Sequence, residues 1–171
     1  GGIVVVEFTL NTMADGGQFL IKAGQGCFDY PIEGFCAKCV IEPVSFDLFA
    51  GQTNLIGELI VTNDDEFLYV TYTANEGELF NETHLYVGTL EGLPVNKQNT
   101  PVPGKFPYKS THEDGVMEFT YTIPLADLGD CYIIAAHAAM NSGETAWSFG
   151  TQFPNTNRWG WYSEYCTQYC P

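Results

Sequence analysis

The chain has 171 residues and carries six lysines and arginines against 21 aspartates and glutamates, a formal net charge of −15. This charge excludes nucleic acids and anionic membrane surfaces as partners, because both are bound mainly through lysine and arginine. Hydrophobic residues make up 45% of the chain, which excludes a disordered acidic tail. No apolar run is long enough to cross a bilayer, so we expect no membrane insertion.

The first 43 residues predict an N-terminal arm and a cysteine-rich connector. Ile3–Leu10 reads IVVVEFTL, a run of β-branched and aromatic residues that strongly favours a β-strand. Glycines and a cluster of cysteines follow this run. We therefore divide the chain into the arm and connector, residues 1–43, and a main domain, residues 44–171.

The main domain alternates short β-forming runs with turn residues. The runs cover, in chain order, residues 44–49, 55–62, 67–73, 84–89, 117–123 and 132–140. The last run is almost continuously apolar and predicts a central strand, while residues 124–128 predict one helical turn before it. Strands at intervals of about 8–12 residues predict an all-β fold. We expect an antiparallel β-sandwich of jelly-roll or immunoglobulin-like type, with an N-terminal strand arm.

The six cysteines predict an oxidising compartment. They are Cys27, Cys36, Cys39, Cys131, Cys166 and Cys170. An even number favours three disulfides, although a four-thiolate zinc site or free thiols are alternatives. Asn81 begins the sequon Asn81-Glu82-Thr83 and is a candidate N-glycosylation site. We expect an extracellular glycoprotein, secreted or held at the cell surface.

Several ordered motifs in the main domain resemble a known kind of domain. They are AGQ at 50–52, ETHLYVG at 82–88, PGKFPYK at 103–109, YTIPL at 121–125, AAHA at 135–138 and ETAW at 144–147. Together they resemble an uncharacterised β-sandwich domain of secreted bacterial surface proteins of the Bacteroidetes type. The resemblance covers roughly residues 46–165. It implies an extracellular structural or adhesive setting and no established enzymatic activity.

Two groups of side chains are candidate metal ligands. Three histidines, His84, His112 and His137, could bind zinc together with a carboxylate, or could each have a structural role. Asp64, Asp65 and Glu66 predict a calcium site on a hairpin, or simply a solvated acidic turn. We expect that no cofactor is required, with calcium as the one candidate ion.

No arrangement of residues predicts catalysis. No serine lies in a G-x-S-x-G motif, and no pair of carboxylates stands out as an acid and a base. We therefore expect that the chain is not an enzyme.

Aromatic residues are concentrated near the C-terminus. Trp147, Trp159 and Trp161 would form a surface that stacks on sugars if they were exposed, and would complete the core if they were buried. The first alternative predicts a secreted carbohydrate-binding or adhesion module with a polysaccharide as partner.

The arm suggests a different function. An apolar strand at a free end must pair to avoid aggregation, either within its own domain or with a neighbouring subunit. We favour donation to a neighbour, through Ile3, Val4, Val5, Val6, Phe8 and Leu10. Repeated head-to-tail donation builds a helical filament, a homo-oligomer. The first expectation for function is thus a pilus-like structural subunit stabilised by disulfides.

Overall fold

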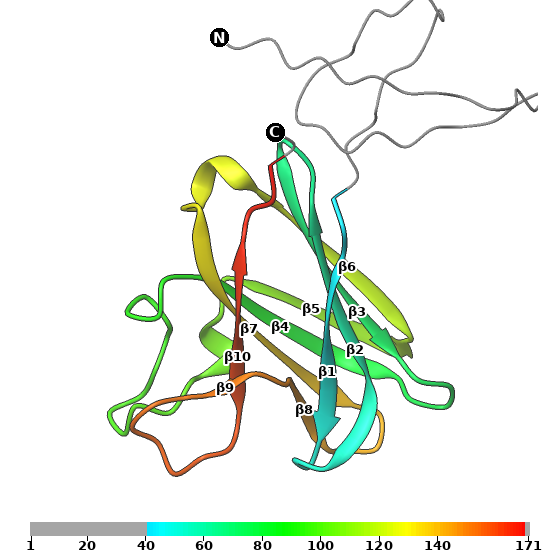
Figure 1. The fold of residues 1–171 in the computed structure, drawn as a ribbon. Coiled ribbons are helices and arrows are strands. Elements are labelled where there is room, and N and C mark those ends of the chain that lie inside the picture. The colour runs from blue at the N-terminus through cyan, green and yellow to red at the C-terminus, as the bar shows by residue number, and fades with distance from the viewer. Residues whose placement is uncertain (1–40, 170–171) are drawn as a thin grey trace, which may run out of the picture. The chain divides into compact units, whose positions relative to one another are not determined.

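The computed structural model describes residues 41–169, which form ten strands and two short 3₁₀ helices (Figure 1). The strands are β1 (Val44–Ala50), β2 (Asn54–Asn63), β3 (Phe67–Ala74), β4 (Phe80–Gly88), β5 (Tyr108–Val116), β6 (Glu118–Pro124), β7 (Cys131–Met140), β8 (Thr145–Ser148), β9 (Thr151–Gln152) and β10 (Trp161–Cys166). The helices are η1 (Pro103–Lys105) and η2 (Leu125–Asp127). The predicted helical turn at 124–128 is thus confirmed. Among residues 41–169, no helix is long and apolar enough to cross a membrane.

The strands pair in one continuous antiparallel sheet. Its order is β5-β4-β7-β8-β1-β2-β3-β6, with β10 paired to β7 and β9 to β10. The sheet curls into a nearly closed barrel, so that its two end strands, β5 and β6, come together. His112 on β5 and Phe119 on β6 lie with their ring centroids 4.7 Å apart. The predicted all-β, antiparallel class is confirmed.

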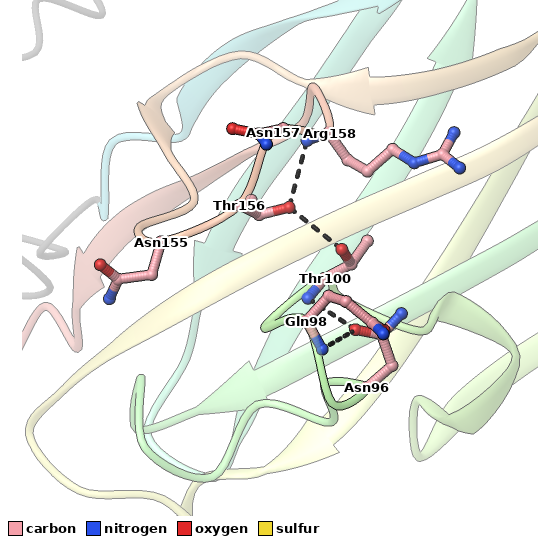
Figure 2. Close-up of a pocket in the computed structure, with 7 residues that line it drawn as sticks. All are labelled: Asn96, Gln98, Thr100, Asn155, Thr156, Asn157 and Arg158. Carbon is pink, nitrogen blue, oxygen red and sulfur yellow. Dashed lines mark hydrogen bonds between the residues drawn. The ribbon is translucent and has the colours of Figure 1, made fainter.

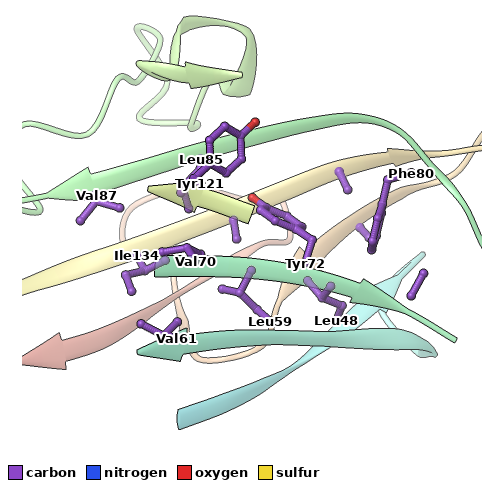
Figure 3. Packing of buried hydrophobic residues seen from close by; sticks show 14 of the residues in the cluster. Leu48, Leu59, Val61, Val70, Tyr72, Phe80, Leu85, Val87, Tyr121 and Ile134 are labelled. Atoms are coloured by element: carbon purple, nitrogen blue, oxygen red, sulfur yellow. The ribbon is translucent and has the colours of Figure 1, made fainter. Parts of the chain in front are cut away.

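The main core fills the inside of this curved sheet. Along β3 every second residue is buried, because alternate side chains of a strand point to opposite faces. Leu68, Val70 and Tyr72 therefore face the core together. Figure 3 shows part of this cluster, which also takes side chains from β1, β2, β4, β6 and β7.

Strand β7 is buried on both faces. Ile134 and Ala136 face the main core, whereas Ile133 and Ala135 on the opposite face belong to a second hydrophobic cluster. The sequence prediction of a central strand is confirmed, since β7 pairs with β4, β8 and β10. The outer face of β7 must be covered by other parts of the chain, and these parts form the site described below.

The two ends of the described chain are joined by buried amide contacts. The Asn63 side chain accepts hydrogen bonds from the Tyr165 hydroxyl (2.8 Å) and the Gln168 backbone N–H (2.9 Å). The Gln168 side-chain amide in turn donates to the Glu42 carbonyl (3.0 Å). Entry to β1 and exit from β10 therefore lie side by side.

One disulfide lies among the described residues. It joins Cys131 on β7 to Cys166 on β10, directly opposite each other in the ladder. Because Cys166 is committed to this bond, it does not serve in the four-thiolate zinc site considered above. Cys27, Cys36, Cys39 and Cys170 lie outside the described residues, as do the donor-strand residues 3–10.

We predict that the double variant Cys131→Ala/Cys166→Ala is folded but less stable. The disulfide closes a loop with a sequence separation of 35 residues, and its loss increases the entropy of the unfolded chain. The free energy of unfolding should fall by about 3–4 kcal/mol in urea titrations under non-reducing conditions. An unchanged free energy of unfolding would contradict a stabilising role for this bond.

Candidate functional site

Two loops cover the outer face of β7. One joins β4 to β5 (residues 89–107), and the other follows β8 and leads to β10 (residues 149–160). They bury the second hydrophobic cluster, which consists of Tyr86, Leu93, Phe106, Ile133, Ala135, Trp147, Phe153 and Tyr162. The hydroxyls of Thr100 and Thr156 join the two loops at 3.1 Å. Core packing thus fixes both loops in place.

The first loop is held in a defined turn by Asn96. Its side-chain oxygen accepts hydrogen bonds from the backbone N–H groups of Gln98 (2.8 Å) and Thr100 (3.0 Å). Its own N–H donates to the Thr100 carbonyl at 2.9 Å. Asn99 adopts a φ of 56°, a left-handed conformation that asparagine tolerates better than most residues. The turn is therefore set by local hydrogen bonds and needs no ligand.

A polar pocket of about 340 Å³ lies between the two loops (Figure 2). Its lining consists mainly of amide and hydroxyl side chains, with one cation: Asn96, Gln98, Thr100, Asn155, Thr156, Asn157 and Arg158. An amide both donates and accepts hydrogen bonds, and so does a hydroxyl. Such a lining suits a ligand rich in hydroxyl groups.

Four aromatic rings form a row on the surface. The row begins at Trp159, which directly follows the pocket residue Arg158, and continues through Trp161 on β10 and Phe149 to Phe49 on β1. Trp159 lies 5.7 Å from Trp161, Trp161 lies 5.4 Å from Phe149, and Phe149 lies 5.8 Å from Phe49, between ring centroids. Phe149 is 50% exposed and the other three rings are partly exposed. We call these four residues the aromatic strip. These partly exposed rings form an apolar surface patch, which is a candidate binding surface.

Gly150 allows the aromatic strip to form. A Cβ atom at this position would lie 2.2 Å from the Tyr162 carbonyl oxygen, a distance that excludes every other residue. The close approach holds the start of the second loop against β10. It places Phe149 beside Trp161 on one surface.

The structure separates the three tryptophans that the sequence grouped together. Trp159 and Trp161 are partly exposed in the aromatic strip and pack against the edge of the second hydrophobic cluster, whereas Trp147 is only 6% exposed and lies within that cluster. Its ring lies 5.2 Å from that of Phe153 and 4.8 Å from that of His137. Trp147 is buried because β8 turns it towards the face that the loops cover. It is therefore not part of the aromatic strip.

The sequence patterns do not predict the pocket or the place of Phe49 in the strip. Phe49 belongs to a predicted strand, and the amide residues of the two loops form no recognisable motif. One signal was present: the polar run Asn155–Arg158 stands directly before Trp159. Polar hydrogen-bonding residues next to exposed tryptophans are typical of a ligand site.

Asp64, one of the three predicted calcium ligands, holds a turn through hydrogen bonds, and the calcium site at Asp64, Asp65 and Glu66 remains a prediction. The Asp64 carboxylate accepts hydrogen bonds from the N–H groups of Glu66 (2.8 Å) and Phe67 (2.7 Å) and from the Tyr69 hydroxyl (2.7 Å). The bond from Tyr69, followed by the two backbone bonds, lowers the pKa of Asp64. The carboxylate therefore stabilises the turn between β2 and β3. Within the described part of the chain, no three histidine, cysteine or acidic side chains are grouped to hold a metal ion.

The three histidines do not meet. His84 and His137 are paired across β4 and β7 with their Nδ1 atoms 3.3 Å apart, whereas His112 lies on β5 beside Phe119. Burial, followed by the charge of its neighbour His84, lowers the pKa of His137 to about 3. Burial also lowers the pKa of His84, against the attraction of Glu82. Both rings are therefore neutral at pH 7. His137 packs against Trp147, and His84 packs against His137.

Asn81, the predicted glycosylation site, is exposed on β4. It occupies an irregularity in the strand, where the register shifts between Phe80 and Glu82. Thr83, the third residue of the sequon, is fully buried and hydrogen-bonds the Tyr121 hydroxyl at 2.9 Å. Glycosylation of Asn81 remains a prediction.

Comparison of the chain with protein-family models, curated proteins and solved structures found no match. The resemblance to a secreted bacterial β-sandwich domain therefore remains a prediction.

We predict that His137 makes stability depend on pH. Its pKa is about 3 in the folded chain against 6.5 when unfolded, so the unfolded state binds more protons between these values. The stabilisation is complete above pH 6.5 and is lost as pH falls towards 3. Because of His137 alone, the free energy of unfolding should be about 2 kcal/mol lower at pH 5 than at pH values well above 6.5.

Denaturant titrations at pH 7.5 and about pH 5 measure this loss. The variant His137→Gln should show a smaller difference between the two pH values than the unsubstituted chain. His112→Gln, which removes a more exposed histidine, serves as the control. An equal difference in His137→Gln and the unsubstituted chain would exclude His137 as the cause.

Proposed function

We propose that this chain is an extracellular carbohydrate-binding module that serves in adhesion and catalyses no reaction. The observation that carries the proposal is the aromatic strip, whose Trp159 directly follows Arg158 of a pocket lined mainly by amides and hydroxyls. Apolar rings and hydrogen-bonding amides are the two kinds of group that a sugar requires. The Cys131–Cys166 disulfide and the resemblance to secreted β-sandwich domains support the extracellular setting.

The aromatic strip and the polar pocket would bind different parts of a sugar. The rings of Trp159 and Trp161 would pack against the C–H faces of sugar rings and release the water over both surfaces. The amides of Asn155 and Asn157 would bind hydroxyl groups at the sugar edge. Because the loops are fixed by the second hydrophobic cluster, binding requires little ordering of the protein. An extended polysaccharide would cover strip and pocket together.

We predict that Trp159→Ala and Trp161→Ala each weaken polysaccharide binding about tenfold, since a central aromatic anchor contributes more than 1 kcal/mol. Affinity electrophoresis in gels that contain dextran, xylan or pectin, with tryptophan fluorescence titration, measures the change. Phe67→Ala, which removes a partly exposed ring on β3, is the matched control and should bind normally. Normal binding by the Trp159→Ala/Trp161→Ala variant would contradict the role of the strip.

We propose as a second function the assembly of a filament by donation of the N-terminal strand. One feature of the described residues favours it: β5 pairs only with β4 and β6 pairs only with β3, so each has one free edge within residues 41–169. A strand from a neighbouring subunit could pair there and complete the barrel. The apolar sequence of Ile3–Leu10 suits such a strand.

Deletion of residues 1–12 tests this second function. We predict that the full chain forms long assemblies at high concentration and that the shortened chain stays folded and monomeric. Negative-stain microscopy and sedimentation measure the assembly state, and circular dichroism verifies the fold. If the full chain is strictly monomeric, or if the shortened chain assembles equally well, donation of the strand is excluded.

A further inference from the structure

Positively charged side chains are confined to two stretches of the described chain. All lysines and arginines between residues 41 and 169 lie in two stretches, residues 92–112 and 145–163. They are Lys97, Lys105, Lys109 and Arg158. Neither stretch contains an aspartate or a glutamate, whereas the rest of the described chain contains many. The two stretches include the whole of the second loop and residues 92–107 of the first loop, whose residues 89–91 contain Glu91.

These cations are not paired with carboxylates. The one contact within 4.0 Å between a basic and an acidic side chain among residues 41–169 joins His84, which is neutral at pH 7, to Glu82. None of the four lysine and arginine side chains therefore lies within 4.0 Å of a carboxylate in this part of the protein. Lys109 donates to the Gly104 carbonyl at 3.3 Å. If the cations served only to offset the negative charge, they would lie beside carboxylates, where the attraction is strongest.

Arg158 is placed to bind a ligand. It lines the pocket and is exposed, and Figure 2 shows its side chain extending from the loop without a hydrogen bond to the other residues drawn. Its backbone is fixed, because its N–H donates to the Thr156 hydroxyl at 3.1 Å. Lys97 stands on the opposite loop between two pocket residues, Asn96 and Gln98. Arg158 is thus the one cation of the pocket lining, and Lys97 lies next to two lining residues in the chain.

We infer that the ligand is an anionic polysaccharide, whose carboxylate or sulfate groups bind at the pocket through Arg158 with the help of Lys97. This inference rests on the proposed carbohydrate-binding function and names the class of its ligand. A guanidinium binds carboxylate or sulfate oxygens through two parallel N–H groups. Amides of the pocket bind the neighbouring hydroxyls.

The net charge adds to selectivity in this arrangement. A protein with a formal charge of −15 repels polyanions over most of its surface. An anionic chain meets the fewest carboxylates at these two loops, where Glu91 is the one acidic residue, so charge favours its approach to the pocket over the rest of the surface. The interaction should weaken with salt, since exposed charges are screened.

The test compares polygalacturonate, dextran sulfate and neutral dextran as ligands in affinity electrophoresis and fluorescence titration. We expect the full chain to bind at least one of the two polyanions at least tenfold more tightly than dextran. The polyanion that binds more tightly shows whether the pocket prefers carboxylate groups or sulfate groups. Arg158→Gln should weaken that binding about tenfold and leave any dextran binding unchanged, and Lys97→Gln should weaken it less.

Lys109→Gln is the matched control, because it removes the same charge at an exposed site outside the pocket lining. An equal loss in Lys109→Gln and Arg158→Gln would mean general electrostatic attraction and would overturn the inference. The inference of an anionic ligand would also be overturned if dextran and both polyanions bound with equal affinity and Trp159→Ala lost this binding. The proposed carbohydrate-binding function would then still stand. Polyanion binding that Arg158→Gln weakens and Trp159→Ala/Trp161→Ala does not would instead support the pocket and contradict the strip.

Discussion

The structure depends on one constraint, the burial of β7 on both faces. Most strands of this sheet have a buried face and a more exposed one, but β7 reads CYIIAAHAAM and is apolar on both. Small side chains such as Ala135 and Ala136 let a packed layer approach from each side. The curled sheet supplies the inner layer. Loops must supply the outer layer, and their aromatic side chains are needed to exclude water from the strand.

The candidate site is a consequence of this outer layer of loops. The inner side chains of the two loops, such as Phe106 and Phe153, are committed to packing, which leaves the outer ones free to vary without loss of the fold. Amides, cations and exposed rings occupy those outer positions. A site built in this way is rigid before the ligand arrives, because the contacts that order it are the contacts of a hydrophobic core.

Much of the fold could be predicted from the sequence, but the site could not. Alternation predicted β3, and the apolar run 132–140 predicted the central strand, since each pattern reports local burial. β5 was missed because an edge strand such as YKSTHEDGV carries no clear alternation. The difference between Trp147 and Trp161 depends on where β8 and β10 lie in the sheet. Likewise the pocket lies between two loops that are distant in sequence, and local sequence patterns do not show which distant segments come together.

The Cys131–Cys166 bond has a consequence for a molecule under mechanical tension. A force that pulls on the two ends of this domain travels along the backbone to Cys131, crosses the sulfur bridge, and continues from Cys166. The segment between the two cysteines carries almost none of the load. That segment contains Phe149, the second loop and both tryptophans of the strip. An adhesion module anchored in flow could therefore lose strands elsewhere while the covalently bypassed loop remains unstretched.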